Sequence, residues 1–320
     1  MKKLLKPFDY IFVLRPVLFF PVWTVFLAGY YGQEKTAVAA ELHGMNGAGS
    51  AGGISFLWVG LALTLLMGAI FILHQVMERK SENRSRNLRL IAPNYLTPKA
   101  AFIEAVVLAL GAILFSFMLS WKLGVVFVGL LLITGLLYSF SPFNFKDKPI
   151  AAVLTAALGA FLIFLAGWLL NGQVSKELLV YAVPYVSVII AIFIITTLPD
   201  EEGAPSGASS FGAKYGLAVT VYTGLFFDLI AVISAYVLQD ELIFYPAFFS
   251  LPFFVWAGMS LKLHDVARAM KYPIFLLALT ICFKWGIEHD SFTLFLGLVG
   301  VYFVSKLYYR LRFGVNYPSL

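Results

Sequence analysis

The sequence predicts an all-α fold, a bundle of nine to ten transmembrane helices around a cavity. Two observations favour this class. Of the 320 residues, 61% are apolar and only 12% are charged, whereas a soluble domain has roughly 25% charged residues. A soluble chain of this size has too little interior to bury so much apolar surface. The apolar residues also form long runs separated by charged connections, which is typical of a polytopic membrane protein.

Ten apolar segments are long enough to cross a bilayer, which takes about 20 residues. The first follows a basic N-terminus, as in a signal peptide, but continues to about Tyr31 without a small-residue cleavage site, so we expect it to be retained. The last two meet where Lys284, Glu288 and Asp290 crowd together, and 291–309 is a possible extra C-terminal span. We expect a single domain over residues 1–320. The segments are 10–32, 54–77, 99–120, 122–141, 150–170, 177–198, 214–238, 241–261, 269–287 and 291–309.

Basic residues gather in the even-numbered connections and at both ends of the chain. The odd-numbered connections hold little more than Lys35, Lys122 and Lys176. The positive-inside rule therefore places both termini in the cytoplasm, and we expect an integral, multi-pass protein of the cytoplasmic membrane. The net charge of +6 follows from this topology, so we expect membrane lipids and no nucleic acid as partners. A single cysteine, Cys282, excludes a disulfide framework.

The second apolar segment ends in a polar face. His74, Glu78 and Glu82 recur every fourth residue, so all three project from one side of a helix. The two carboxylates lie at the C-terminal end of this helix, where its dipole disfavours each of them by ~0.3–1 kcal/mol. A positive charge is therefore expected beside them, from basic side chains or from a metal ion.

A second acidic cluster, Asp200, Glu201 and Glu202, follows Pro199, which ends or kinks the sixth segment. Two facing carboxylate clusters would suit Mg²⁺, which prefers oxygen ligands and completes its shell with water and substrate phosphates. Alternatively, both clusters are solvated helix ends neutralised by basic neighbours. Spacing alone favours this alternative. The basic neighbours are Arg79, Lys80, Arg84 and Arg86.

Three further stretches resemble the UbiA superfamily of intramembrane prenyltransferases. The sequence LLYSFSPFNFKDKP at 136–149 resembles the family's "YS…P…LK…P" segment. Arg15-Pro16 resembles the family's opening, and RLIAPNYLTPKAA at 89–101 resembles the segment that leads into the third helix. The resemblance extends from residue 15 to about 216, in the family's order and separation.

The two Asp-rich motifs of the family are degenerate in this chain. His74, Glu78 and Glu82 stand at the positions of N-x-x-x-D-x-x-x-D. The second motif, D-x-x-D-x-E-G-D, corresponds to Thr197, Asp200, Glu202, Gly203 and Ala204, so its first and last acids are absent. The chain thus resembles a divergent member of the family.

The resemblance implies a UbiA-like bundle of nine membrane helices around a large cavity, with cytoplasmic helix–loop caps near 78–98 and 199–213. It implies a Mg²⁺-dependent prenyltransferase, a transferase of alkyl groups other than methyl. Such an enzyme transfers an isoprenyl group from an isoprenyl diphosphate to a hydrophobic acceptor, either aromatic or lipid. The alternative is a non-catalytic homologue that binds an isoprenoid, quinone or lipid in the same cavity.

The resemblance also implies the site residues. The catalytic metal ligands would be Glu78, Glu82, Asp200 and Glu202. We expect His74 to hydrogen-bond the diphosphate or Glu78, because Mg²⁺ seldom binds nitrogen. Alternatives stay open for two basic residues, since Arg15 can snorkel to the interface and Lys146 can be a positive-inside residue. The implied substrate-binding residues are Arg15, His74, Arg89, Tyr138, Ser139 and Lys146.

Asp228 lies deep within an apolar segment. Acids inside membrane spans are functional hypotheses because they are costly to insert. Asp228 is expected either to face the cavity or to bond a neighbouring helix.

Overall fold

The computed structural model describes residues 6–42, 56–78, 91, 96–198, 210–314 and 317, with backbone only for 37–42 and Glu78. Nine helices in this part of the chain are long and apolar enough to cross a membrane, and the helix at 121–137 is shorter. The predicted all-helical fold is confirmed. Each of the ten predicted segments corresponds to a helix.

The membrane-length helices are α2 (Phe19–Leu42), α3 (Phe56–Glu78), α4 (Pro98–Leu119), α6 (Pro149–Trp168), α7 (Lys176–Thr196), α8 (Phe211–Val237), α9 (Glu241–Ser260), α10 (Leu263–His289) and α11 (Thr293–Phe313). The shorter one is α5 (Trp121–Leu130), which continues as a π-helix, η3 (Leu131–Leu137). The short elements are η1 (Lys6–Phe8), α1 (Asp9–Phe12), η2 (Pro16–Leu18) and η4 (Phe145–Asp147).

Local sequence explains where several helices begin. The Thr97 hydroxyl accepts a hydrogen bond from the Ala100 amide at 3.3 Å, and Pro98 occupies the first turn of α4. The Ser210 hydroxyl caps α8 in the same way through the Ala213 amide. Such caps satisfy amide groups that a helix start leaves without a partner.

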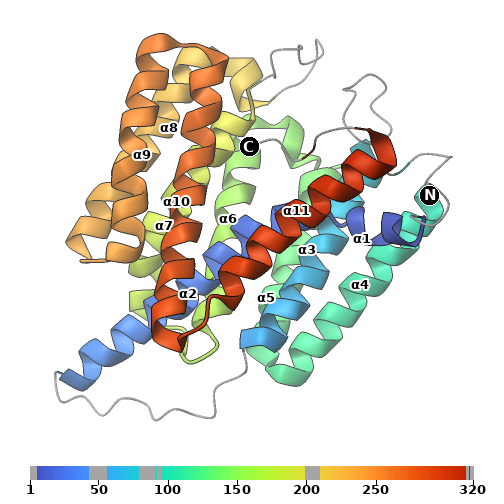
Figure 1. Ribbon diagram of the computed structural model, residues 1–320, viewed down its shortest axis with the longest axis horizontal. Helices are drawn as coiled ribbons and strands as arrows, with labels where there is room; N and C mark the ends of the chain where they lie inside the picture. The colour runs from blue at the N-terminus through green and yellow to red at the C-terminus, as the bar shows by residue number, and fades with distance from the viewer. Residues whose placement is uncertain are drawn as a thin grey trace.

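The helices form two groups on either side of a central pair. Figure 1 shows α7 to α10 on the left, α3 to α5 on the right, and α2 and α6 between them. The helix ends alternate between two ends of the bundle, as the ten-segment prediction requires. We call the end at which α3 finishes and α4 begins the site end, and the other the opposite end.

Two glycines let α2 and α6 cross in backbone contact. A Cβ added at Gly29 would lie 1.9 Å from the Phe164 carbonyl oxygen, and one added at Gly167 would lie 1.8 Å from the Phe26 carbonyl oxygen. Small residues allow such close approach between membrane helices. The crossing places α2 in the core, where its side chains join those of α6 and α7.

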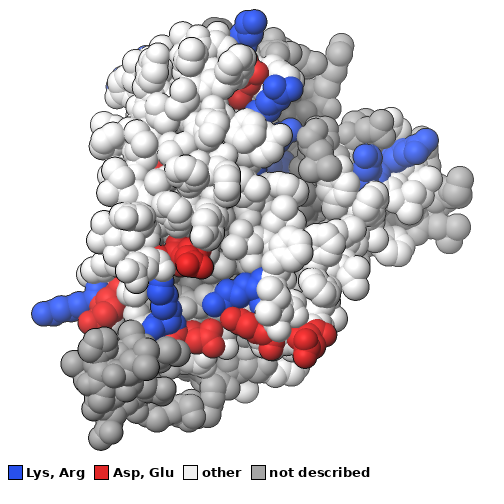
Figure 2. All heavy atoms as spheres, turned by 60° about the vertical axis from the view of Figure 1, so that its left-hand side comes forward, with Lys and Arg blue, Asp and Glu red and all other residues white. Residues whose placement is uncertain are grey.

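Polar contacts join the helices at the opposite end. The Tyr185 hydroxyl donates to Asp240 Oδ2 at 2.9 Å, and burial raises the pKa of Asp240 above its ordinary value. The Lys284 ammonium lies 3.2 Å from Glu288 Oε1 and 4.4 Å from the centre of the Tyr31 ring. Figure 2 shows both signs of charge gathered toward this end, below a broad uncharged band. The first contact connects α7 with the start of α9, and the Lys284–Tyr31 contact connects α10 with α2.

Asp228 is fully buried between α8 and α9. The Ser250 hydroxyl lies 3.2 Å from Asp228 Oδ1, in position to donate a hydrogen bond. Of the two roles expected for this acid, the structure shows the bond between helices.

Candidate functional site

Five of the ten predicted site residues have described side chains: Arg15, His74, Tyr138, Ser139 and Lys146. The other five lie outside the described residues or, for Glu78, have only a described backbone. They are Glu78, Glu82, Arg89, Asp200 and Glu202. The structure therefore describes five of the six predicted substrate-binding residues and none of the predicted metal-binding side chains.

His74 connects α3 to the π-helix η3. Its Nε2 lies 2.7 Å from the Thr134 carbonyl oxygen, so Nε2 carries a proton and donates it to this bond. The His74 and Tyr138 ring centres are 5.2 Å apart. π-Helical turns occur frequently at functional sites, and this one positions Tyr138 directly after its last residue.

This hydrogen bond limits what a neutral His74 ring can donate. With Nε2–H donating to Thr134, the neutral ring has only an acceptor left at Nδ1. A diphosphate offers acceptors, so a neutral His74 in this tautomer has no proton to donate to it. In this structure His74 joins α3 to η3 through a backbone carbonyl, and a bond from His74 to Glu78 or to a diphosphate stays a prediction.

Two basic residues lie close enough to His74 for their charges to act on it, Lys146 from η4 and Arg15 from the turn before η2. Arg15, His74, Tyr138 and Lys146 are all half-buried, whereas Ser139 is buried. The structure thus gathers two cations and two rings that keep accessible surface, which suits a ligand with an anionic group.

Gln75 is a neighbouring polar residue that sequence reasoning missed. Its side-chain amide donates to the Val13 carbonyl oxygen at 2.7 Å. Arg15, two residues after Val13, has a left-handed backbone with φ of 55°. Leu14 packs against α3, where a Cβ added at Gly68 would lie 2.5 Å from its Cδ2 atom. The sequence signal that could have revealed this contact was a polar residue, Gln75, directly after His74 in an apolar helix.

Thr197 and Ser210 fix the chain on either side of the second acidic motif. The Ser210 hydroxyl donates to the Thr197 carbonyl at 2.9 Å, and the Gly212 amide donates to Thr197 Oγ1 at 2.8 Å. Thr197 stands where the family's motif has its first acid. Here its hydroxyl joins the end of α7 to the start of α8.

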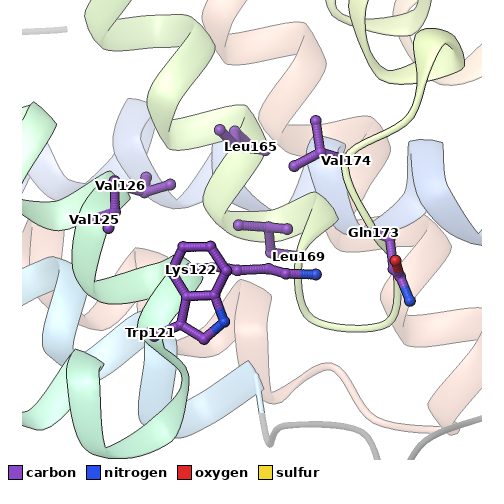
Figure 3. Close-up of a pocket in the computed structure, with 8 residues that line it drawn as sticks. All are labelled: Trp121, Lys122, Val125, Val126, Leu165, Leu169, Gln173 and Val174. Carbon is purple, nitrogen blue, oxygen red and sulfur yellow. The ribbon is translucent and has the colours of Figure 1, made fainter.

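The described part of the chain supplies cations for a phosphate but no complete metal site. Within it, no three His, Cys, Asp or Glu side chains come together as ligands. Two apolar cavities also lie away from the gathered residues. One, of about 380 Å³, lies between α5 and α6, with Lys122 and Gln173 at its rim (Figure 3). The other, of about 220 Å³, lies between α10 and α11.

The nine membrane-length helices among the described residues and the cationic site define an integral, multi-pass membrane protein. Residues 36–272 match the model of the UbiA prenyltransferase family. The chain therefore belongs to the UbiA prenyltransferase family, as the motifs at 136–149 and 15–16 predicted. Comparison with curated proteins finds no match.

Solved structures of UbiA homologues have the same fold. A UbiA homologue from Archaeoglobus fulgidus bound to GPP and Mg²⁺ is 18% identical, with a TM-score of 0.60, covering 85% of this chain and 99% of that one. The same organism's homologue bound to DMAPP and Mg²⁺ is also 18% identical, with a TM-score of 0.59 and the same coverage. A structure of a digeranylgeranylglyceryl phosphate synthase is 16% identical, with a TM-score of 0.60, covering 86% of this chain and 97% of that one.

We expect His74→Phe to destabilise the protein by about 1–3 kcal/mol, because it keeps a ring beside Tyr138 but leaves the Thr134 carbonyl without its donor. The measurement is thermal unfolding of the detergent-solubilised protein. His264→Phe is the control, since the His264 side chain is 67% exposed and its replacement should have little effect. Equal unfolding temperatures for the two variants would contradict the role given to His74.

Proposed function

We propose that the protein transfers an isoprenyl group from an isoprenyl diphosphate to a hydrophobic acceptor, in a reaction that requires Mg²⁺. One observation carries the proposal: Arg15 and Lys146 lie within electrostatic range of His74 in a chain that belongs to the UbiA family. Family members of similar structure bind GPP or DMAPP together with Mg²⁺, which supports the same donor class here.

In this proposal the cations bind the diphosphate. Breaking the bond between the isoprenyl carbon and the diphosphate oxygen leaves both electrons on the oxygen, so negative charge develops there. Arg15 and Lys146 stabilise that charge best if they are already in place before the bond breaks. The ring of Tyr138 offers an aromatic face to the allylic cation that forms. The acceptor then attacks this cation and loses a proton.

Glu78, Glu82, Asp200 and Glu202 would hold Mg²⁺, which neutralises the diphosphate and assists its departure. Carboxylate oxygens suit this ion, and replacing Asp with Glu keeps the ligand type. Without a metal, each carboxylate would repel a diphosphate charge ~4 Å away by roughly 4 kcal/mol at an effective dielectric of 20. Two nearby cations offset only part of that repulsion.

The proposal is tested by incubating the protein in membranes with a panel of radiolabelled isoprenyl diphosphates and quinone, aromatic and lipid acceptors. Release of diphosphate and labelled product is measured with Mg²⁺ and with EDTA. We expect turnover with at least one donor, and only with the metal. Undiminished turnover in EDTA would reject the metal mechanism.

A non-catalytic binding protein is the second candidate function. Two acids of the second motif are absent, and the structure gives Thr197, at one of their positions, a helix-capping role. Binding of a labelled isoprenoid or quinone without turnover of any donor would favour this candidate.

We further propose that the site end and both termini face the cytoplasm. The test uses single cysteines at Gln33 and Lys214 in a Cys282→Ser background. A membrane-impermeant maleimide added from outside intact cells should label position 33 and should label position 214 only after the cells are opened. Labelling of both from the same side would contradict the topology.

A further inference from the structure

The last helix, α11, contacts the site end through a single face. Its buried residues are Ser305, Tyr308, Tyr309 and Arg312, which share one side of the helix. Its other faces expose large apolar side chains such as Phe303 and Leu307. α11 is the tenth segment, one more than the resemblance to the family implies. The contacts of its buried face indicate what this additional helix does.

A buried ion pair attaches α11 to the N-terminal segment. Arg312 donates from Nε to Asp9 Oδ1 at 3.0 Å and from Nη2 to Asp9 Oδ2 at 2.7 Å. The Tyr308 hydroxyl also donates to Asp9 Oδ1, at 2.6 Å, and its ring stacks on Phe12 with centres 3.7 Å apart. A two-pronged Arg–carboxylate pair fixes orientation as well as distance, so α11 has one defined position against α1.

The same face of α11 reaches the turn that carries Arg15. The Tyr309 hydroxyl lies 3.4 Å from the Phe12 carbonyl oxygen and donates to it. That carbonyl also accepts the backbone amide of Arg15, at 3.1 Å. On the other side of the turn, Gln75 of α3 donates to the Val13 carbonyl. The turn is therefore held between α3 and α11.

The backbone of Arg15 needs such support. Its φ of 55° lies in the left-handed region, which is unfavourable for a residue with a Cβ. A strained residue keeps its conformation only where the surrounding structure holds it. Tyr309 also lies within electrostatic range of the Arg15 guanidinium.

We propose that Tyr309, with the Asp9–Arg312 pair, holds the left-handed turn at Arg15 and so positions the Arg15 guanidinium to bind the oxyanions of the donor diphosphate. This inference rests on the proposed function. It assigns α11 a part in substrate recognition, and Tyr309 is a positioning residue because it acts through Arg15.

The first test is a double-mutant cycle between Tyr309→Phe and Arg15→Gln, assayed for donor turnover. In the wild-type background, loss of one hydroxyl should raise the donor KM by about three- to tenfold, with a smaller change in kcat. In the Arg15→Gln background Tyr309→Phe should change nothing, since a residue acting through another loses its effect when that residue is absent. No change in KM in the wild-type background, or an equal change in both, would overturn the proposal.

The matched control is Tyr302→Phe, which removes the same hydroxyl two turns away on the same side of α11. It should leave the donor KM at the wild-type value. A rise in KM equal to that of Tyr309→Phe would show a general effect on α11 and would overturn the positioning role.

A second measurement needs no turnover and separates this inference from the proposed function. Phenylglyoxal modifies accessible arginines, and mass spectrometry gives its rate of reaction at Arg15. We expect this rate to change in Tyr309→Phe and to stay at the wild-type value in Tyr302→Phe. If no donor reacts and yet the rate changes, the proposed function fails while the positioning of Arg15 stands. An unchanged rate rejects the positioning.

Discussion

We expect Gly167→Ala to prevent folding of the bundle. The added Cβ would lie 1.8 Å from the Phe26 carbonyl oxygen, and this atom belongs to a helix backbone that no side-chain rotation can move. Overpacking usually costs about 1–3 kcal/mol, and here α2 and α6 must separate along their whole contact. Gly29→Ala makes the reciprocal clash with Phe164 and should have the same effect. The yield of monodisperse protein after solubilisation measures both.

Gly111→Ala is the matched control for these variants. Gly111 lies in α4, and nothing lies within 4 Å of a Cβ added there. Alanine is favoured over glycine within a helix by about 1 kcal/mol, so this variant should be as stable as the wild type or slightly more so. A normal yield and unfolding temperature for Gly167→Ala would show that α2 and α6 do not meet as described.

The second large effect concerns the proposed metal ligands. Glu78→Gln and Asp200→Asn keep side-chain size but remove the charge that would hold Mg²⁺, and we expect each to lower donor turnover by a factor of about 10²–10³, as for loss of one group that stabilises a transition-state charge. Raising the Mg²⁺ concentration should restore part of the loss. Initial rates over a Mg²⁺ titration measure both effects.

Glu241→Gln is the control, because Glu241 is an exposed carboxylate at the start of α9, at the opposite end of the bundle. It should leave the rate and its Mg²⁺ dependence unchanged. Wild-type rates for both Glu78→Gln and Asp200→Asn would remove these residues from the mechanism, whatever the assay shows for other positions.

The fold followed from the sequence because length and hydropathy suffice to define membrane helices. All ten segments were predicted, including the short fourth one that ends in η3. Arg15, Tyr138 and Lys146 were assigned to the site through family motifs, since these residues come from separate parts of the chain, and their roles in binding stay a prediction. No local pattern in the sequence brings them together.

Other features could not be predicted because they depend on pairs of distant residues. A glycine in an apolar run does not reveal that a carbonyl of another helix lies against it, as at Gly167. Asp9 and Arg312 are 303 positions apart, and each alone resembles a charge at a membrane surface. The hydrogen bond of His74 to Thr134 likewise depends on a carbonyl, which carries no sequence signal.

The polar contacts at the opposite end have a consequence for the passage of charged solutes through the bundle. A charged solute entering there would have to break the buried Tyr185–Asp240 hydrogen bond, and buried polar groups left without a partner are costly. In the proposed reaction, the charged diphosphate donor and the released diphosphate are therefore expected to enter and leave at the site end. The hydrophobic isoprenyl chain, in contrast, would need no aqueous exit, since the bilayer surrounds the helices. Exchange at one end alone would let the proposed reaction proceed without opening a path for ions across the bilayer.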